Sequence, residues 1–249
     1  MAAYDFSSVR LFVDAPLAEG AEIAFEDGQA NYLRNVMRMG EGDGLLVFNG
    51  RDGEWAARLV EVAKKRVRAE AQERTRPQTA PGRLRFLFAP LKHARLDYMA
   101  QKAVEMGVSR LSPVITRRTQ VARLNLERMR ANAVEAAEQC GVLSLPEIDV
   151  PAALDAVLAG WPEGEALVFC DEEAAGEGPT QPLMALAGRP IAVLIGPEGG
   201  FDPAERKALL ATPSIVRIGL GPRILRADTA AVAALAVVQA VAGDWRAGH

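Results

Sequence analysis

Histidine and cysteine are scarce in this sequence. Two histidines, His93 and His249, and two cysteines, Cys140 and Cys170, occur among 249 residues. A Ser-His-Asp triad or a multi-histidine metal site would have to rest on His93 alone. Two cysteines are too few for a disulfide framework or a four-cysteine zinc site, and we interpret both as small buried hydrophobic side chains. We therefore expect no metal and no histidine chemistry.

Long apolar runs are also missing. No stretch approaches the roughly 20 apolar residues that a membrane-spanning helix needs. The first residues, "MAAYDFSSVRLFVD", lack a basic segment followed by an apolar one. We therefore expect no signal peptide, no membrane association and a cytoplasmic protein.

What the chain does have is an uneven distribution of charge. Hydrophobic residues make up 49% and charged residues 24%, as in ordinary globular proteins of one or two domains, and the net charge is -3. Residues 64–130, however, hold 17 basic and 5 acidic residues, whereas the rest holds 12 basic and 27 acidic ones. This excess indicates either a surface for a polyanion such as nucleic acid or a set of solvated helix faces.

The first 75 or so residues contain short apolar runs between turn signals, which is typical of a small β-barrel or sandwich. One interruption has Tyr32, Leu33, Val36 and Met37 at helical spacing and stops at Gly40, which predicts a helix. Residues 73–83 are polar and contain two prolines, so we interpret them as the linker to a second domain.

After the linker, strand and helix patterns alternate. This alternation, with strands that are apolar throughout, predicts an α/β domain in which helices cover both faces of a parallel sheet. The expected strands are 84–90, 111–116, 165–170, 191–196 and 214–219, and the expected helices are 94–107, 124–141, one beginning at 202–203 and one over 228–241.

Two glycine-rich stretches follow expected strands: "GPEGG" at 196–200 and "GLGPRILRADT" at 219–229. Ligands of open α/β sheets bind outside the carboxyl ends of the strands, and glycine lets backbone groups approach a ligand directly. Neither stretch is a Walker loop, and the second has only two of the three glycines of a dinucleotide fingerprint. Each alone is compatible with a tight turn, but together they indicate a binding site, which a side chain at Gly199 would crowd.

At this point the motifs resemble a known family. "LIGPEGGF" followed by "IGLGPRILRADTA" closely resembles the ribosomal RNA small subunit methyltransferase E family, which belongs to the SPOUT methyltransferases. "APLKHARLDYMAQKAVEMGVSRLSPVITRRT" and "AAEQCG" resemble its internal segments, and "YLRNVMRMGEGDGLLVFNG" resembles its PUA-like RNA-binding domain. The resemblance covers essentially the whole chain in the right order.

The resemblance implies a PUA-like β-barrel over residues 1–75 and a SPOUT domain with a C-terminal trefoil knot over 76–249. It further implies a homodimer through the second domain. The implied reaction is methylation of N3 of one uridine of 16S ribosomal RNA, on the assembled small subunit, with S-adenosylmethionine as cofactor. Cofactor contacts are implied for a region near 169–171 and for two loops, specifically for Phe169, Leu194, Ile195, Gly196, Pro197, Glu198, Gly199, Gly200, Ile218, Gly219, Leu220, Gly221, Ile224 and Leu225.

The reaction places a demand on charged side chains, because uracil N3 carries a proton at neutral pH and is then a poor nucleophile. Either a cation stabilises the uracil anion or a base removes the proton. Arg223 and Arg226 suit the first role, and Arg226 is the preferred candidate. Asp228 or Glu198 suits the second if burial raises its pKa. Purely structural roles are the alternatives: Asp228 as an acid at the start of a helix, Glu198 as a brace within its own turn.

Arg34 and Arg38, one helical turn apart, are expected to share a face that contacts RNA phosphates. Other candidates for phosphate contacts are Lys92, Arg95, Lys102, Arg117, Arg118, Arg123 and Arg223. Three positions depart from the family pattern and bear on substrate contacts: Asp228 stands where glutamate is usual, Val142 stands where arginine is usual, and a histidine common near Asn31 is missing.

Two rival hypotheses remain open at this stage. A non-catalytic RNA-binding or ribosome assembly factor would keep the fold and bind RNA without transferring a methyl group. A nucleotide-dependent enzyme of dinucleotide-binding type is disfavoured by the missing third glycine. Binding measurements with NAD and with S-adenosylmethionine would separate the second rival from the methyltransferase.

Overall fold

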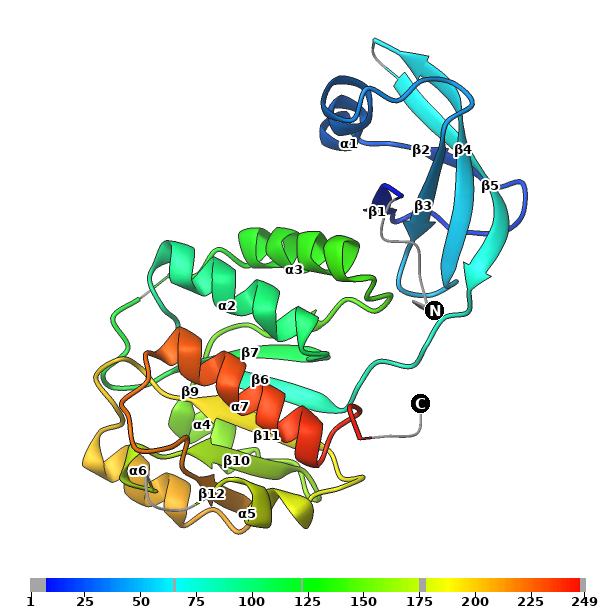
Figure 1. Ribbon diagram of the computed structural model, residues 1–249. Helices are drawn as coiled ribbons and strands as arrows, with labels where there is room; N and C mark the ends of the chain where they lie inside the picture. Colours follow the sequence, from blue (N-terminus) through cyan, green and yellow to red (C-terminus); the bar gives the residue numbers. More distant parts are fainter. Residues whose placement is uncertain (1–7, 65, 122, 175–177, 247–249) are drawn as a thin grey trace. The chain divides into compact units, whose positions relative to one another are not determined.

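The computed structural model describes residues 8–64, 66–121, 123–174 and 178–246, without the side chain of His93 (Figure 1). His249 lies outside the described residues. The chain divides into two compact units. The first unit holds residues 1–80 and 137–145, and the second holds 81–136 and 146–249. The short segment 137–145 therefore groups with the N-terminal residues, which a division of the sequence into 1–75 and 76–249 does not anticipate.

The first unit is a five-stranded sheet in the order β1-β3-β4-β5-β2, with β1 and β3 parallel and the other pairs antiparallel. Its core is built from alternating inward-facing side chains such as Ile23, Val47, Leu59 and Val67. This mixed sheet agrees with the predicted small β-fold. Its strands are β1 (Arg10–Phe12), β2 (Glu22–Ala24), β3 (Gly44–Phe48), β4 (Glu54–Ala63) and β5 (Arg66–Arg76).

Strand β5 runs to Arg76, so the polar residues 73–76 belong to a strand and not to the linker. The reason is Glu54, which is buried at the start of β4. Thr75 Oγ1 donates a hydrogen bond of 2.9 Å to its carboxylate, and Arg76 Nη2 donates another of 3.0 Å. A buried carboxylate needs such partners, and they extend the strand pairing into a sequence that reads as a loop.

The predicted helix near Tyr32 forms, but not as an α-helix throughout. A short α-helix, α1 (Asp27–Asn31), continues into a π-helix over Tyr32–Val36. The wider turn, closed by the bond from Met37 N–H to the Tyr32 carbonyl, rotates the later side chains outward. Leu33 is buried as expected, whereas Val36 is 61% and Met37 42% exposed. The helical spacing of these side chains therefore does not bury Val36 and Met37.

The same geometry separates two arginines. Arg34 lies in the π-helix, and Arg38 follows the end of the helix in the left-handed region with φ 57°. They do not share a helical face, which corrects the expectation. Arg34 instead donates hydrogen bonds to the carbonyls of Ala63 and Lys64, where β4 turns toward β5.

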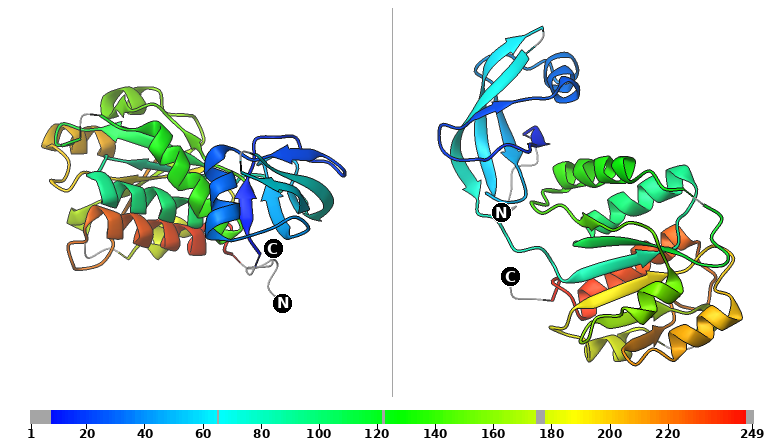
Figure 2. Two further views of the ribbon diagram at one scale, coloured as in Figure 1. Left: turned by 90° about the horizontal axis from the view of Figure 1, so that it is seen from above. Right: turned by 180° about the vertical axis from the view of Figure 1, so that it is seen from behind.

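The second unit is a parallel sheet in the order β12-β10-β11-β6-β7-β8, with β9 also paired to β7 (Figure 2). Its apolar strands and its parallel pairing agree with the α/β prediction. The strands are β6 (Leu84–Phe88), β7 (Arg110–Ile115), β8 (Glu147–Ile148), β9 (Ala152–Ala153), β10 (Ala166–Cys170), β11 (Ile191–Ile195) and β12 (Ile215–Ile218).

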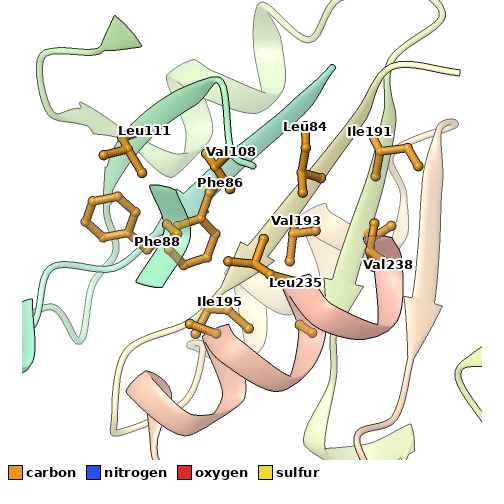
Figure 3. Packing of buried hydrophobic residues seen from close by; sticks show 14 of the residues in the cluster. Leu84, Phe86, Phe88, Val108, Leu111, Ile191, Val193, Ile195, Leu235 and Val238 are labelled. Atoms are coloured by element: carbon orange, nitrogen blue, oxygen red, sulfur yellow. The ribbon is translucent and has the colours of Figure 1, made fainter. Parts of the chain in front are cut away.

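Helices pack on both faces of this sheet, because successive strand residues point to opposite sides. On one face Phe86, Val193 and Ile195 meet Leu235 and Val238 of the last helix (Figure 3). On the other face side chains such as Leu194 pack against α4 and α6. The helices are α2 (His93–Glu105), α3 (Leu126–Cys140), α4 (Leu154–Ala159), α5 (Thr180–Met184), α6 (Pro203–Leu210) and α7 (Ala227–Val241), with a 3-10 turn over Glu172–Ala174.

None of the helices in the described part of the chain is both long and apolar enough to cross a membrane. The trefoil knot implied by the resemblance stays a prediction. What matters for the site is the order of three neighbouring strands: β10 lies between β12 and β11. Because the strands are parallel, the segments that follow them emerge at one edge of the sheet.

Candidate functional site

A cavity of about 340 Å³ lies at the carboxyl ends of β10, β11 and β12. Its walls come from the three segments that follow these strands and from the start of α7. They combine apolar surface with four carboxylates and three guanidinium groups. The lining residues are Phe169, Cys170, Asp171, Glu172, Glu173, Ile195, Gly196, Pro197, Glu198, Gly200, Phe201, Arg206, Leu220, Gly221, Pro222, Arg223, Ile224, Leu225, Arg226, Ala227 and Ala230.

Most of the residues predicted to contact the cofactor line this cavity, but four do not. Leu194 is buried in the core cluster that includes residues of α4 and α6, and Ile218 is buried in the core beneath α7. Gly219 is buried just past β12, and Gly199 lies on the far side of its turn. The structure thus brings both glycine loops together as expected, although not every residue of either loop faces the cavity.

The "GPEGG" segment is a tight turn that leads directly into a helix. Gly200 N–H donates a 2.9 Å hydrogen bond to the carbonyl of Pro197, and Gly200 has φ +67°, which favours glycine. Asp202 then caps α6: its Oδ1 accepts from Ala204 N–H at 2.9 Å, and Glu205 Oε2 accepts from Asp202 N–H at 3.0 Å. This reciprocal capping box fixes the end of the loop.

Gly196 is the glycine of this loop that has no room for a side chain. A Cβ atom there would lie 2.5 Å from Cε2 of Phe201. The Phe201 ring in turn packs edge-on against Phe169, with ring centroids 5.4 Å apart. At Gly199, by contrast, an added Cβ would lie 3.7 Å from Arg118 Cδ, which is ordinary contact. An added Cβ atom at Gly199 would therefore meet Arg118, and Gly196 is the position where the protein leaves no room for one.

Three arginines contact this loop and the start of α6 from outside the cavity. Arg95 forms an ion pair with Glu198, and Arg118 Nη1 donates a 2.7 Å hydrogen bond to the carbonyl of Gly199. Arg117 Nη1 donates to Asp202 Oδ1 at 2.9 Å. All three were predicted to bind RNA phosphates, and the sequence gives no sign of these internal contacts.

Between the two glycine loops, the end of β10 carries a buried carboxylate. Asp171 Oδ2 accepts hydrogen bonds of 2.7 Å from Arg206 Nη2 and from Arg217 Nε. Burial alone would raise the pKa of Asp171, but these two arginines and the Glu173 N–H lower it below its ordinary value. Asp171 therefore joins α6, which follows the first loop, to β12, which precedes the second. The neighbouring Cys170 is neutral, since burial raises its pKa to about 12.

The second loop, residues 219–226, is more exposed. Gly221 has φ +94° with open space around it, and the Ile224 side chain is 92% exposed. Arg226 occupies the N-cap of α7 without a capping hydrogen bond from its side chain, and it lines the cavity together with Arg223. Both guanidinium groups are thus available at the mouth of the site.

The two candidate bases occupy different positions. Glu198 lines the cavity, but its side chain is 43% exposed and paired with Arg95, so the burial that would favour a base is not present. Asp228 lies in the first turn of α7 outside the cavity lining, where its Oδ1 accepts from Thr229 N–H at 3.0 Å. Neither Glu198 nor Asp228 is therefore buried as a base with a raised pKa would need to be, whereas Arg223 and Arg226 both line the cavity.

The other predicted RNA contacts are dispersed. Lys102 pairs with Glu105 at 2.7 Å and lies over the Tyr98 ring. Lys92 and Arg123 are exposed. Of the positions that depart from the family pattern, Val142 lies in the segment 137–145 of the first unit, and Asn31 ends α1.

Sequence reasoning missed several lining residues. Three acids, Asp171, Glu172 and Glu173, follow β10 directly, and only Asp171 lay within the expected third contact. A run of acids at the end of an apolar strand is a signal that could have identified them. Arg206, which joins this group from α6, gave no comparable signal in the sequence.

The comparisons with known proteins agree on one family. Residues 78–239 match the family described as RNA methyltransferase domain, and residues 25–72 match the RNA methyltransferase PUA domain. Ribosomal RNA small subunit methyltransferase E of Rickettsia conorii is 29% identical over 92% of this chain and 94% of its own. The protein of that name from Bacillus subtilis is 27% identical over 89% of this chain and 91% of its own.

Two solved structures resemble the whole chain. One is a ribosomal RNA small subunit methyltransferase E from Neisseria gonorrhoeae bound to S-adenosylmethionine, with TM-score 0.84 and 27% identity, covering 96% of this chain and 99% of that one. The other is a methyltransferase from Legionella pneumophila in complex with the same cofactor, with TM-score 0.85 and 28% identity, covering 95% and 99%.

Proposed function

The chain belongs to the RNA methyltransferase family, and from that premise we propose that it transfers a methyl group from S-adenosylmethionine to 16S ribosomal RNA of the small subunit. The observation that carries the proposal is the cavity formed by the two glycine loops at adjacent strand ends. Relatives that match about nine tenths of the chain or more are named ribosomal RNA small subunit methyltransferase E. Two similar solved structures contain S-adenosylmethionine.

The residues present fit this cofactor. The cavity has the size of a small-molecule site, and Gly196 leaves space where a Cβ atom would meet Phe201. Phe169, Ile195 and Leu225 offer apolar surface to an adenine ring, and backbone groups of the loops offer donors and acceptors for its edge. The carboxylates of the cavity suit the positively charged ammonium and sulfonium groups of the cofactor. The arginines of the cavity suit the carboxylate group of the cofactor. When bound, S-adenosylmethionine supplies an electrophilic methyl group.

We propose N3 of a uridine as the target atom, as the resemblance to the family implies. Loss of the N3 proton leaves a negative charge spread over N3 and the two neighbouring carbonyl oxygens. We assign Arg226 to stabilise that charge, because it lines the cavity at the start of α7, and Arg223 to hold a nearby phosphate or carbonyl. Asp228 and Glu198 remain candidates for accepting the proton, with Glu198 the one that lines the cavity.

RNA binding would use both units. The likeness of residues 25–72 to a PUA domain supports RNA contacts by the first unit, where Arg34 and Arg38 are the candidates. In the second unit Lys92, Arg123 and Arg223 are exposed and Lys102 is half-buried. Contacts of this kind neutralise phosphates and position the enzyme without reading sequence. The assembled small subunit is the proposed form of the substrate.

We also propose a homodimer formed through the second unit, in the cytoplasm. The support lies on α7, an apolar helix whose residues Val232, Ala233 and Val237 are only partly buried, whereas Leu235 and Val238 pack on the sheet. Ile224, which lines the cavity, is a further exposed apolar residue of this unit. A second copy would cover these side chains, as apolar patches on stable proteins usually require.

The deciding experiment is transfer of a labelled methyl group from S-adenosylmethionine to small ribosomal subunits from cells that lack this protein. Mass spectrometry of the digested RNA then locates the modified nucleoside. N3-methyluridine at one site is the expected result. Cofactor binding without transfer to subunits or to free 16S RNA would instead indicate a non-catalytic RNA-binding or assembly factor.

A further inference from the structure

The first glycine loop has two sides, and only one of them faces the cavity. Pro197, Glu198 and Gly200 line the cavity, whereas Gly199 packs toward Arg118. Arg118 comes from the segment after β7, so residues far apart in the sequence meet at the outer side of the turn.

Both ends of one peptide group in this turn are held. The carbonyl of Gly199 accepts the 2.7 Å hydrogen bond from Arg118 Nη1, and the N–H of Gly200 donates its 2.9 Å bond to the Pro197 carbonyl. The hydrogen bond to Arg118 sets the orientation of this peptide and directs its carbonyl toward a residue outside the cavity lining. A charge-assisted hydrogen bond to a carbonyl is stronger than a neutral one, so Arg118 is suited to fix that orientation.

Two more arginines hold the residues on either side of this peptide. Arg95, from α2, pairs with Glu198. Arg117 Nη1 bonds Asp202, the N-cap of α6, and the Arg117 N–H donates to Glu205 Oε1 at 2.7 Å. The loop is thus fastened at Glu198, at Gly199 and at Asp202 by groups that lie outside the cavity.

We infer that Arg95, Arg117 and Arg118 are positioning residues for the cofactor, which hold the 196–202 loop in its binding conformation from behind and are not primarily phosphate ligands. The inference rests on the proposed function, since it concerns the same cavity. The basic residues of the segment 64–130 then have two different roles. Arg95, Arg117 and Arg118 act on the loop, while the exposed Lys92 and Arg123 remain available to RNA. A loop that is already ordered binds its ligand with a smaller entropic cost.

The test measures cofactor affinity and RNA affinity separately on the full chain. Calorimetry gives Kd for S-adenosylmethionine, and filter binding of 16S RNA at several salt concentrations gives affinity and the number of phosphate contacts. Arg118→Ala is the main variant, Arg118→Lys the conservative one, and Arg123→Ala the matched control from the same segment. Circular dichroism melts confirm folding, which an exposed side chain such as Arg118 should not determine.

We expect Arg118→Ala to raise Kd for S-adenosylmethionine about tenfold, with the RNA salt dependence unchanged, because a charged hydrogen bond to the loop is lost. Arg118→Lys should recover part of the affinity, and kcat at saturating cofactor should stay near the parent value. Arg123→Ala should show the reverse pattern, with weaker RNA binding and unaltered Kd for the cofactor. Arg95→Gln and Glu198→Gln should each weaken cofactor binding, and their combination should cost less than the two separate effects together.

The inference is overturned if Arg118→Ala leaves cofactor Kd within about twofold of the parent and lowers the RNA salt slope by about one phosphate contact. The inference is also overturned if the effects of Arg95→Gln and Glu198→Gln on the free energy of cofactor binding add up fully in the double variant. Absence of S-adenosylmethionine binding by the parent protein would overturn the proposed function itself, so the two failures are distinguished by the parent titration alone.

Discussion

The two glycine loops of the cavity differ in how they are held. The first, residues 196–202, is fastened by three arginines, an internal turn bond and the capping box of α6. The second, residues 219–226, has open space around Gly221 and a 92% exposed Ile224. A ligand site therefore combines one wall that is formed in advance with one that a ligand or a partner would complete. The ordered loop 196–202 suits tight binding of a small ligand, and the open loop 219–226 suits contact with a large substrate.

The largest expected effect concerns the open loop. Arg226→Ala should lower kcat by about a hundredfold to a thousandfold, because it removes the cation proposed to stabilise the uracil anion. Cofactor Kd should change much less than kcat, since the apolar walls and the first loop are unchanged and Arg206 and Arg223 still line the cavity. Single-turnover methyl transfer with calorimetry of cofactor binding measures both quantities. Unchanged turnover would remove Arg226 from the mechanism.

The connection between the loops is the next target. Asp171→Asn should lower the free energy of unfolding by about 2–3 kcal/mol, because Arg206 and Arg217 lose a buried charged acceptor. Since the folded pKa of Asp171 is depressed, its contribution is present above the pKa of the unfolded chain and disappears as pH falls through the folded value.

Urea denaturation of both proteins at several pH values checks this prediction. The difference between parent and Asp171→Asn should be full near neutral pH and should shrink below about pH 4. Asp14→Asn, which alters an exposed carboxylate paired with Arg51 at 3.2 Å, is the control for loss of a carboxylate charge. A difference that is constant with pH would mean that Asp171 does not stabilise the fold as a carboxylate.

The fixed wall itself can be tested with a matched pair of glycines. Gly196→Ala should raise cofactor Kd about thirtyfold, because its Cβ would lie 2.5 Å from Phe201 and the ring must move. Gly199→Ala should change Kd by no more than about twofold, since its Cβ would make only ordinary contact with Arg118. Equal effects at the two positions would show that the two sides of the loop are not distinct.

The smallest effect on the folded chain is expected at the tip of the open loop. Ile224→Ser should alter the free energy of unfolding by less than about 0.5 kcal/mol, because the side chain packs against little in one copy. It should nevertheless weaken self-association, which analytical ultracentrifugation measures over a concentration series. A dimer of undiminished stability would place Ile224 outside the proposed interface.

Particular residues show how far the sequence alone reaches. The apolar run 191–195, the glycine that follows it and Asp202-Pro203 predict a strand, a turn and a capped helix, and all three form. These are local features, because a strand pattern and a helix cap are each encoded within a few neighbouring residues. The family motifs add the pairing of the two glycine loops in one site, which the cavity lining agrees with.

The sequence-based predictions that the structure corrects share a different cause. Residues 73–76 read as a linker because Glu54, the buried partner that holds Thr75 and Arg76, lies some twenty positions away. Val36 and Met37 fit a helical stripe, and only the π-turn rotates them outward. In each case the deciding contact or turn geometry is not encoded in the periodicity of the neighbouring sequence.

The alternation of strands and helices, the two glycine loops and the family to which they belong all follow from the order of the residues. Tertiary packing determines which side of each loop faces the ligand and what the basic residues do. Arg118 and Gly199 are separated by 81 positions, and Arg95 and Glu198 by 103, so no local pattern records that they meet. Arginines in the sequence predict positive charge. Only the packing of α2 and of the segment after β7 against the loop 196–202 determines whether that charge meets a phosphate or a carbonyl.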